Sequence, residues 1–183
     1  MVYDAKTGKS VALDFREMAP RAATRDMYLD AKGNVVDGKS LYTHYAVGVP
    51  GTVAGMEHAL KTWGTMPLAK VVAPAAALAE QGYPVSETLA KVLLQTKKTM
   101  GQWPATQAIF WKNGEPLKAG DLLVQKDLAA SMRLIGSEGA KAFYEGAIAT
   151  RIAAEMASHK GALTLEDLHS YKVVEREPTR GTY

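Results

Sequence analysis

The chain has 183 residues, of which 47% are hydrophobic, and a net charge of only +3, so it is long enough to bury a core. Its basic residues are scattered among acids and form no stripe with interleaved aromatics, which argues against a nucleic acid partner. The absence of cysteine excludes disulfides and thiolate metal sites. The longest apolar run, residues 71–79, contains Pro74 and is too short to span a membrane, and no secretory signal opens the sequence.

The start of the chain predicts a β-hairpin. Residues 1–3 are typical of a strand, and residues 10–15 alternate between apolar and small or charged side chains, which is the period of a half-buried strand. Gly8 in the intervening turn can supply a positive φ. A two-stranded hairpin is not stable alone, so further strands must join it.

Arg16 stands where the second predicted strand gives way to a loop that ends at Pro20. The period of a strand places Asp14 and Arg16 on the same face. A guanidinium there can hold a planar anion with two parallel hydrogen bonds, which a lysine cannot do. From the pattern alone, an exposed ion pair of Arg16 with Asp14 or Glu17 is the favoured alternative.

The middle of the chain is mainly helical in its periodicity. Residues 21–29 predict a short helix, and apolar residues at helical spacing predict another over residues 52–63, ending at Gly64. Gly51 and Gly55 could cradle an anion at the start of this helix, but close packing of the helix on a sheet is the preferred interpretation because no phosphate-loop lysine follows.

The remaining helices and strands follow from local signals. We expect a helix over residues 67–82 that Pro74 kinks or splits, and a helix capped by Ser86 that ends near Gly101. The other expected elements are a strand at 108–112, a turn at 113–114, a short strand or loop at 121–125, helices within 128–156, a capping box at 164–167 and an extended segment at 173–175. The aromatic pair at 110–111 is interpreted as local core.

A self-contained active site is not evident. His44, His58, His159 and His169 show no metal-ligand spacing relative to each other or to carboxylates, and Glu155 falls on a predicted solvated face. No serine or threonine has the context of an activated nucleophile. We therefore expect no metal and no cofactor, and the residues alone indicate no self-contained active site.

Several motifs in order resemble one enzyme family. They are DFREMAP (14–20), ATRDM (23–27), GVPGTVAG (48–55), WGTMP (63–67), AIFWK (108–112), GEPLK (114–118) and FYEG (143–146). This series is similar to the large subunit of bacterial gamma-glutamyltransferase, also called gamma-glutamyl transpeptidase, and it covers essentially the whole chain.

The resemblance implies an N-terminal-nucleophile hydrolase with an αββα four-layer sandwich, made as a zymogen that processes itself into two subunits. The catalytic threonine opens the small subunit and would lie outside this chain, so we expect an internal fragment that is inactive alone. Its own content should be α+β and predominantly α. We expect a single segment over residues 1–183, with a sheet hairpin at 1–20, a mainly helical layer at 21–172 that includes a small hairpin near 108–125, and the start of a returning strand at 173–183.

The resemblance also implies roles for three residues. Arg16 matches the arginine that binds the α-carboxylate of the γ-glutamyl donor, while Asp14 and Glu17 match supporting positions. The implied partners are glutathione or another γ-glutamyl donor and the small subunit of the same precursor. The implied location is the periplasm or the exterior. Three alternatives remain open: a related cephalosporin acylase, a poly-γ-glutamate depolymerase, and a non-catalytic helical interaction module.

Overall fold

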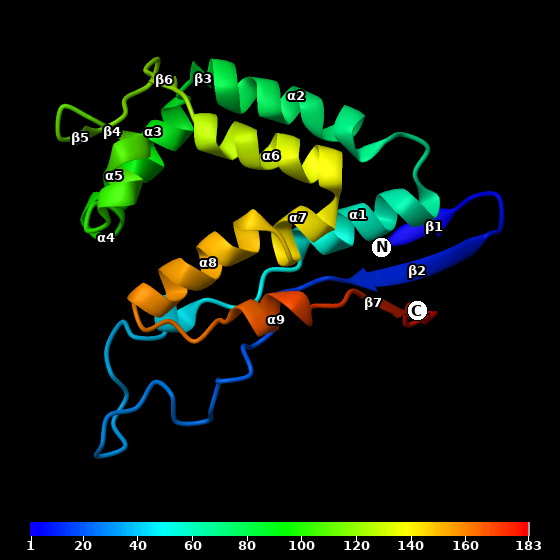
Figure 1. The fold of residues 1–183 in the computed structure, drawn as a ribbon, viewed down its shortest axis with the longest axis horizontal. Coiled ribbons are helices and arrows are strands. Elements are labelled where there is room, and N and C mark those ends of the chain that lie inside the picture. The colour runs from blue at the N-terminus through cyan, green and yellow to red at the C-terminus, as the bar shows by residue number, and fades with distance from the viewer. Residues whose placement is uncertain (183) are drawn as a thin grey trace. The chain divides into compact units, whose positions relative to one another are not determined.

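The computed structural model describes residues 1–182 and divides them into two compact units (Figure 1). The first unit joins Met1–Leu68 to the described residues from Glu138 onward, and the second is Ala69–Ser137. None of the helices within residues 1–182 is both long and apolar enough to cross a lipid bilayer.

A three-stranded antiparallel sheet forms one side of the first unit. The strands β1 (Val2–Asp4), β2 (Lys9–Asp14) and β7 (Val174–Arg176) are paired in the order β1-β2-β7. Gly8 has a φ of 69°, as the predicted hairpin turn requires. The predicted extended segment near residue 174 is β7, which supplies the third strand that the hairpin needed. The last position of the predicted returning strand, Tyr183, lies outside the described residues.

The helices of the first unit pack around one apolar cluster. These helices are α1 (Thr52–Trp63), α7 (Ala140–Tyr144), α8 (Ala147–Ser158) and α9 (Leu165–His169). The short 3-10 helix η1 (His44–Ala46) lies in the connection before α1. The buried members of the cluster are Val49, Ala140, Tyr144, Ala149, Leu163 and Leu168.

The start of helix α1 lies close to Phe15, the residue after β2, because the N-cap Gly51 and Gly55 within the helix lack a side chain. A Cβ on Gly55 would overlap the ring of Phe15, and one on Gly51 would overlap the carbonyl oxygen of the same residue. The interpretation of these glycines as positions that allow close packing of the helix is confirmed.

The prediction of a helix over residues 21–29 is wrong, because the structure forms turns there. The turns are closed by bonds of short span, such as the amide of Met27 donating to the carbonyl of Thr24. Just beyond, the carboxylate of Asp30 accepts from the amides of Lys32 and Asn34, each at 2.8 Å. Side-chain acceptors of this kind compete with helical bonding, and one or two helical turns are marginal without tertiary support.

The second unit is built mainly from helices. They are α2 (Leu68–Gln81), α3 (Glu87–Gln95), α4 (Lys97–Met100), α5 (Pro104–Phe110) and α6 (Lys126–Glu138). Helices α2 and α6 lie side by side (Figure 1) and are joined by an ion pair between Arg133 and Glu80 at 2.6 Å. The predicted cap at Ser86 is confirmed, since its hydroxyl oxygen accepts from the amide of Leu89 at 3.1 Å.

Short strand pairs complete this unit. They are β3 (Tyr83–Pro84) with β6 (Leu122–Leu123), and β4 (Trp111–Lys112) with β5 (Glu115–Pro116). The β4-β5 turn contains Asn113 and Gly114 at positive φ, as the sequence predicted. Phe110 and Trp111 pack on a core of Val85, Leu93, Leu117 and Leu123, which confirms their interpretation as local core.

Two predictions for the second unit need correction. The strand expected at 108–112 is limited to Trp111–Lys112, because Pro104 begins a helix that runs to Phe110. Helix α2 is a single helix through Pro74, so of the expected kink or split only the split is wrong, since the surrounding run of alanines has high helix propensity.

Candidate functional site

Asp14, the last residue of β2, connects the backbone of Arg16 to the neighbouring strand. One carboxylate oxygen of Asp14 accepts from the amide of Arg16 at 3.3 Å. The other accepts from Nε of Arg176, the last residue of β7, at 2.9 Å. These hydrogen bonds, that from Arg176 first, lower the pKa of Asp14. The carboxylate therefore joins the start of the Arg16 loop to the neighbouring strand.

A second anchor reaches Arg16 from the core. The hydroxyl of Tyr171 donates to the carbonyl oxygen of Arg16 at 2.9 Å, and the Tyr171 ring stacks on Tyr144 with centroids 5.5 Å apart. The Tyr144 hydroxyl in turn donates to the carbonyl of Pro50 at 2.7 Å. A Cβ on Gly51 would overlap the Tyr171 hydroxyl, so this contact requires glycine. The backbone of Arg16 is thus tied to the buried cluster.

The guanidinium of Arg16 is exposed and paired with its neighbour. Its side chain is 83% exposed, and Nε and Nη2 donate to the two carboxylate oxygens of Glu17 at 2.9 and 2.7 Å. This bidentate hydrogen bonding lowers the pKa of Glu17 to about 2. The structure therefore contains the Arg16–Glu17 pair that the sequence left open as an alternative.

The Arg16–Glu17 pair leaves one edge of the guanidinium available. Glu17 occupies the Nε/Nη2 edge, and among residues 1–182 the structure shows no partner on Nη1. The Nη1/Nη2 edge can still offer two parallel N–H donors to a second carboxylate. Glu17 therefore pairs with one edge of the exposed guanidinium, and the other edge retains the means to bind an anion.

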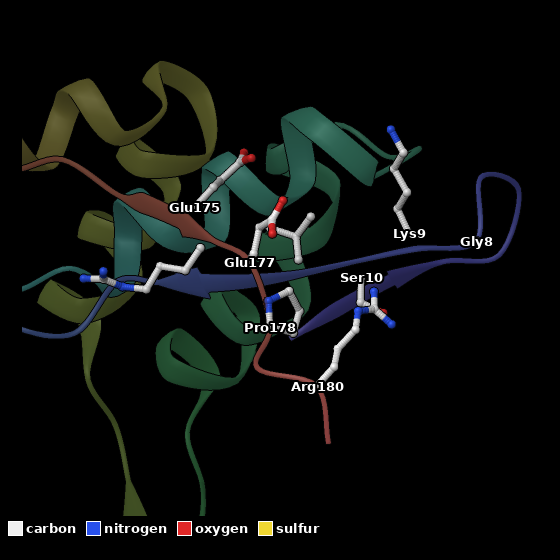
Figure 2. A pocket seen from close by; sticks show the side chains of 9 residues that line it. Gly8, Lys9, Ser10, Glu175, Glu177, Pro178 and Arg180 are labelled. Atoms are coloured by element: carbon white, nitrogen blue, oxygen red, sulfur yellow. The ribbon is translucent and has the colours of Figure 1, made fainter. Parts of the chain in front are cut away.

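A groove of about 590 Å³ lies along the same sheet (Figure 2). Residues of the β1-β2 turn, of β2 and of the segment around β7 line it, among them Lys9, Glu175, Glu177 and Arg180. Its charges are mixed in sign, and neither Arg16 nor its two supporting residues contribute to it. The groove therefore adds nothing to the predicted site.

Sequence reasoning missed one cluster of potential metal ligands. Side-chain ligand atoms of His44, Glu155 and His159 all lie within 4.8 Å of one another. The statement that these histidines lack metal-ligand spacing is therefore corrected. The only local signal was the four-residue spacing of Glu155 and His159, because His44 is 111 positions from Glu155.

The other two histidines have different surroundings. Nε2 of His58 lies 2.6 Å from a carboxylate oxygen of Glu175, which links α1 to β7. His169 is exposed at the end of α9.

Comparison with known proteins gives matches along the whole chain. A family model described as gamma-glutamyltranspeptidase matches residues 1–183. The chain is 50% identical to the glutathione hydrolase proenzyme of Escherichia coli strain K12 and 41% identical to that of Bacillus subtilis strain 168. In both cases the match covers 100% of this chain, but it covers only 32% and 31% of the two relatives. The chain therefore spans about a third of the length of these relatives.

A solved structure also matches the whole of this chain. The crystal structure of Helicobacter pylori gamma-glutamyltranspeptidase superposes with a TM-score of 0.96 at 44% identity, covering 100% of this chain and 52% of that one. The predicted fold class, a mainly helical α+β part of an N-terminal-nucleophile hydrolase, is confirmed by this likeness.

Proposed function

The chain belongs to the gamma-glutamyltranspeptidase family, as its motifs predicted, and we propose that it forms part of the large subunit of a gamma-glutamyltransferase. The observation that carries the proposal is the match over the whole chain, at 50% identity, to a protein named glutathione hydrolase proenzyme. The word proenzyme supports a precursor that is cleaved to give a small subunit. The intact enzyme is periplasmic or secreted, as the family resemblance implies.

The reaction is acyl transfer from a γ-glutamyl amide such as glutathione. The hydroxyl of the threonine that opens the small subunit attacks the γ-carbonyl carbon, and its own α-amine takes the hydroxyl proton. The amide C–N bond breaks, and the leaving amine departs with a proton. Water or an acceptor amine then attacks the acyl-enzyme, releasing the glutamyl group and restoring the threonine.

Within this chain, Arg16 is the residue proposed to bind the donor. Its Nη1/Nη2 edge would take the α-carboxylate of the γ-glutamyl group, while Glu17 holds the opposite edge. The amide of Arg16 donates to Asp14, and the carbonyl oxygen of Arg16 accepts from Tyr171, so the backbone of this residue is held at both ends. Arg16 forms no covalent bond; it places the γ-carbonyl within reach of the nucleophile, and such positioning accounts for a large part of enzymatic rate.

The proposal predicts that Arg16→Lys impairs the intact enzyme. Lysine keeps the charge but cannot form two parallel hydrogen bonds, so the donor would be held less accurately. We expect kcat/KM for release of the amine from a γ-glutamyl anilide to fall by roughly 100-fold, the loss that a misplacement of about 1 Å can cause. The matched control is Arg21→Lys, because Arg21 is also exposed and paired with a glutamate, Glu166, and should retain normal kinetics.

A second donor identifies the group that Arg16 binds. The 4-aminobutanoyl anilide is the γ-glutamyl anilide without its α-carboxylate, so Arg16→Lys should not lower its slow turnover further. An equal loss with both donors would contradict the assignment of Arg16 to the carboxylate. Absence of γ-glutamyl turnover by the full-length protein, with turnover of a cephalosporin side-chain amide instead, would favour the acylase alternative. Activity of residues 1–183 without the rest of the precursor would mean that a nucleophile within them was missed.

A further inference from the structure

Two histidines and a glutamate meet at the C-terminal end of α8. His44 begins η1, in the long connection of residues 21–49, while Glu155 and His159 lie one helical turn apart. Nε2 of His44 and Nδ1 of His159 each lie 3.2 Å from the same carboxylate oxygen of Glu155. The imidazole rings are stacked, with centroids 4.2 Å apart and planes 7° apart. We refer to these three residues as the His-Glu cluster.

The chemistry of the His-Glu cluster suits a divalent transition-metal ion. Two imidazole nitrogens and one carboxylate oxygen are common ligands of Zn²⁺, whereas Ca²⁺ and Mg²⁺ prefer oxygen ligands alone. Tetrahedral bonds of about 2.0 to 2.1 Å place neighbouring ligand atoms roughly 3.3 Å apart. The observed nitrogen-to-oxygen separations of 3.2 Å match that spacing.

The backbone around the His-Glu cluster brings its two halves together. Helix α8 ends at Ser158, Lys160 adopts a positive φ of 57°, and the chain turns back through Gly161. A Cβ on Gly161 would lie 3.1 Å from the carbonyl oxygen of His44, so this turn lies directly against the backbone of η1. The His44 side chain is also only 16% exposed, which restricts its motion. The tertiary fold therefore fixes one ligand against the helix that bears the other two.

We propose that His44, Glu155 and His159 bind a Zn²⁺-like ion, which fastens the connection of residues 21–49 to α8. Binding requires the stacked rings to tilt so that their lone pairs converge on one point. It also requires Nδ1 of His159 to leave the hydroxyl of Ser158, which now lies 2.9 Å away. A fourth position would be filled by water, as in zinc sites with three protein ligands. The connection that carries His44 also begins just after Arg16, so the ion would steady the loop that follows the proposed donor site.

The test uses the full-length protein, stripped with a chelator and titrated with Co²⁺ and Zn²⁺. Co²⁺ bound by nitrogen and oxygen ligands gives visible absorption that Zn²⁺ removes. We expect His44→Gln, Glu155→Gln and His159→Gln each to lose this absorption and to weaken Zn²⁺ binding by more than the roughly 10- to 100-fold that loss of an outer-shell partner costs. The matched control is His169→Gln, which removes an exposed histidine of the same unit and should leave both readouts unchanged.

Hydrogen exchange provides a readout independent of the spectrum and of enzyme activity. Zn²⁺ should slow exchange of the amides in residues 39–47, because an ion that binds only the folded form stabilises it. Glu155→Gln keeps the shape of the side chain and guards against a variant that fails to fold. Equal Co²⁺ absorption in this variant and in the parent protein, or an equal loss in His169→Gln, would overturn the proposal.

Discussion

Asp167 offers the sharpest test of how the first unit is held together. Its carboxylate is only 3% exposed and accepts three hydrogen bonds. Two come from Thr164, through the amide at 2.8 Å and the hydroxyl at 2.6 Å, and complete the capping box of α9. The third comes from the amide of Arg21, 146 positions earlier in the chain, at 2.9 Å. One side chain thus caps a helix and fastens the distant loop after Pro20.

We predict that Asp167→Ala destabilises the protein by about 2 to 4 kcal/mol. The variant keeps Thr164 as the N-cap but leaves the amides of Thr164 and Arg21 without their acceptor, and a buried amide in that state costs about 1 to 3 kcal/mol. With a urea m-value of about 2 kcal/mol per M, the unfolding midpoint should fall by about 1 to 2 M. Hydrogen exchange at the Arg21 amide should accelerate in parallel.

The matched control is Glu166→Ala. Glu166 binds the same partner, since the Nη1 of Arg21 donates to its carboxylate at 3.1 Å, but both side chains are more than 60% exposed. Exposed pairs of this kind contribute about 0 to 1 kcal/mol. Equal destabilisation by Asp167→Ala and Glu166→Ala would refute the reasoning from burial.

The effect should also depend on pH. Burial alone would raise the pKa of Asp167, but the hydrogen bonds from Thr164 and Arg21 outweigh it, so the pKa lies below its ordinary value. A carboxylate with a lowered pKa contributes stability that is complete above its unfolded-state pKa, about 3.9, and is lost as the pH falls through the folded-state pKa. The difference in unfolding free energy between the parent and Asp167→Asn should therefore shrink as the solution is acidified below that value.

Two further substitutions test the packing that supports Arg16. Tyr144→Phe leaves the carbonyl of Pro50 without its donor and should lower the free energy of unfolding by about 1 to 3 kcal/mol in urea titrations. Because burial raises the pKa of Tyr144 to about 12, the same variant should remove one strongly alkaline phenol from a spectrophotometric titration, and an unchanged titration would contradict this. Gly55→Ala places a methyl group within the ring of Phe15 and should cost about 1 to 3 kcal/mol by thermal denaturation, so an unchanged Tm would mean that α1 does not approach β2 so closely.

The features that the sequence predicted correctly are those whose signals lie within a few residues. Gly8 marks the first hairpin, Ser86 caps α3, and Asn113-Gly114 forms the turn between β4 and β5. The capping box with Asp167 in place of glutamate was also found, because its two partners are three positions apart. In each case one residue type satisfies a local backbone requirement, so the pattern is sufficient.

Predictions failed where a local alternative competes with periodicity. The apolar residues of 21–29 have helical spacing over little more than two turns. The backbone hydrogen bonds there span three residues and form separate turns instead of a helix. The strand expected at 108–112 contains β-branched and aromatic residues. Pro104, however, has a φ suited to the first position of a helix, and the helix that begins there continues to Phe110. Both outcomes depend on residues at the edge of the segment rather than within it.

The arrangement of the candidate site could not have been predicted, because its contacts cross most of the chain. The motif supplies the guanidinium of Arg16, which can donate several hydrogen bonds, and the neighbouring Glu17, which accepts two of them. The orientation of the guanidinium depends also on Tyr171, 155 positions away, and on the Asp14–Arg176 bond, which spans 162 positions. Since both distant contacts come from the segment that leads into and forms β7, the pairing of β7 with β2 fixes the backbone that carries the guanidinium. The residues after α9 therefore support the proposed donor site as much as the motif does.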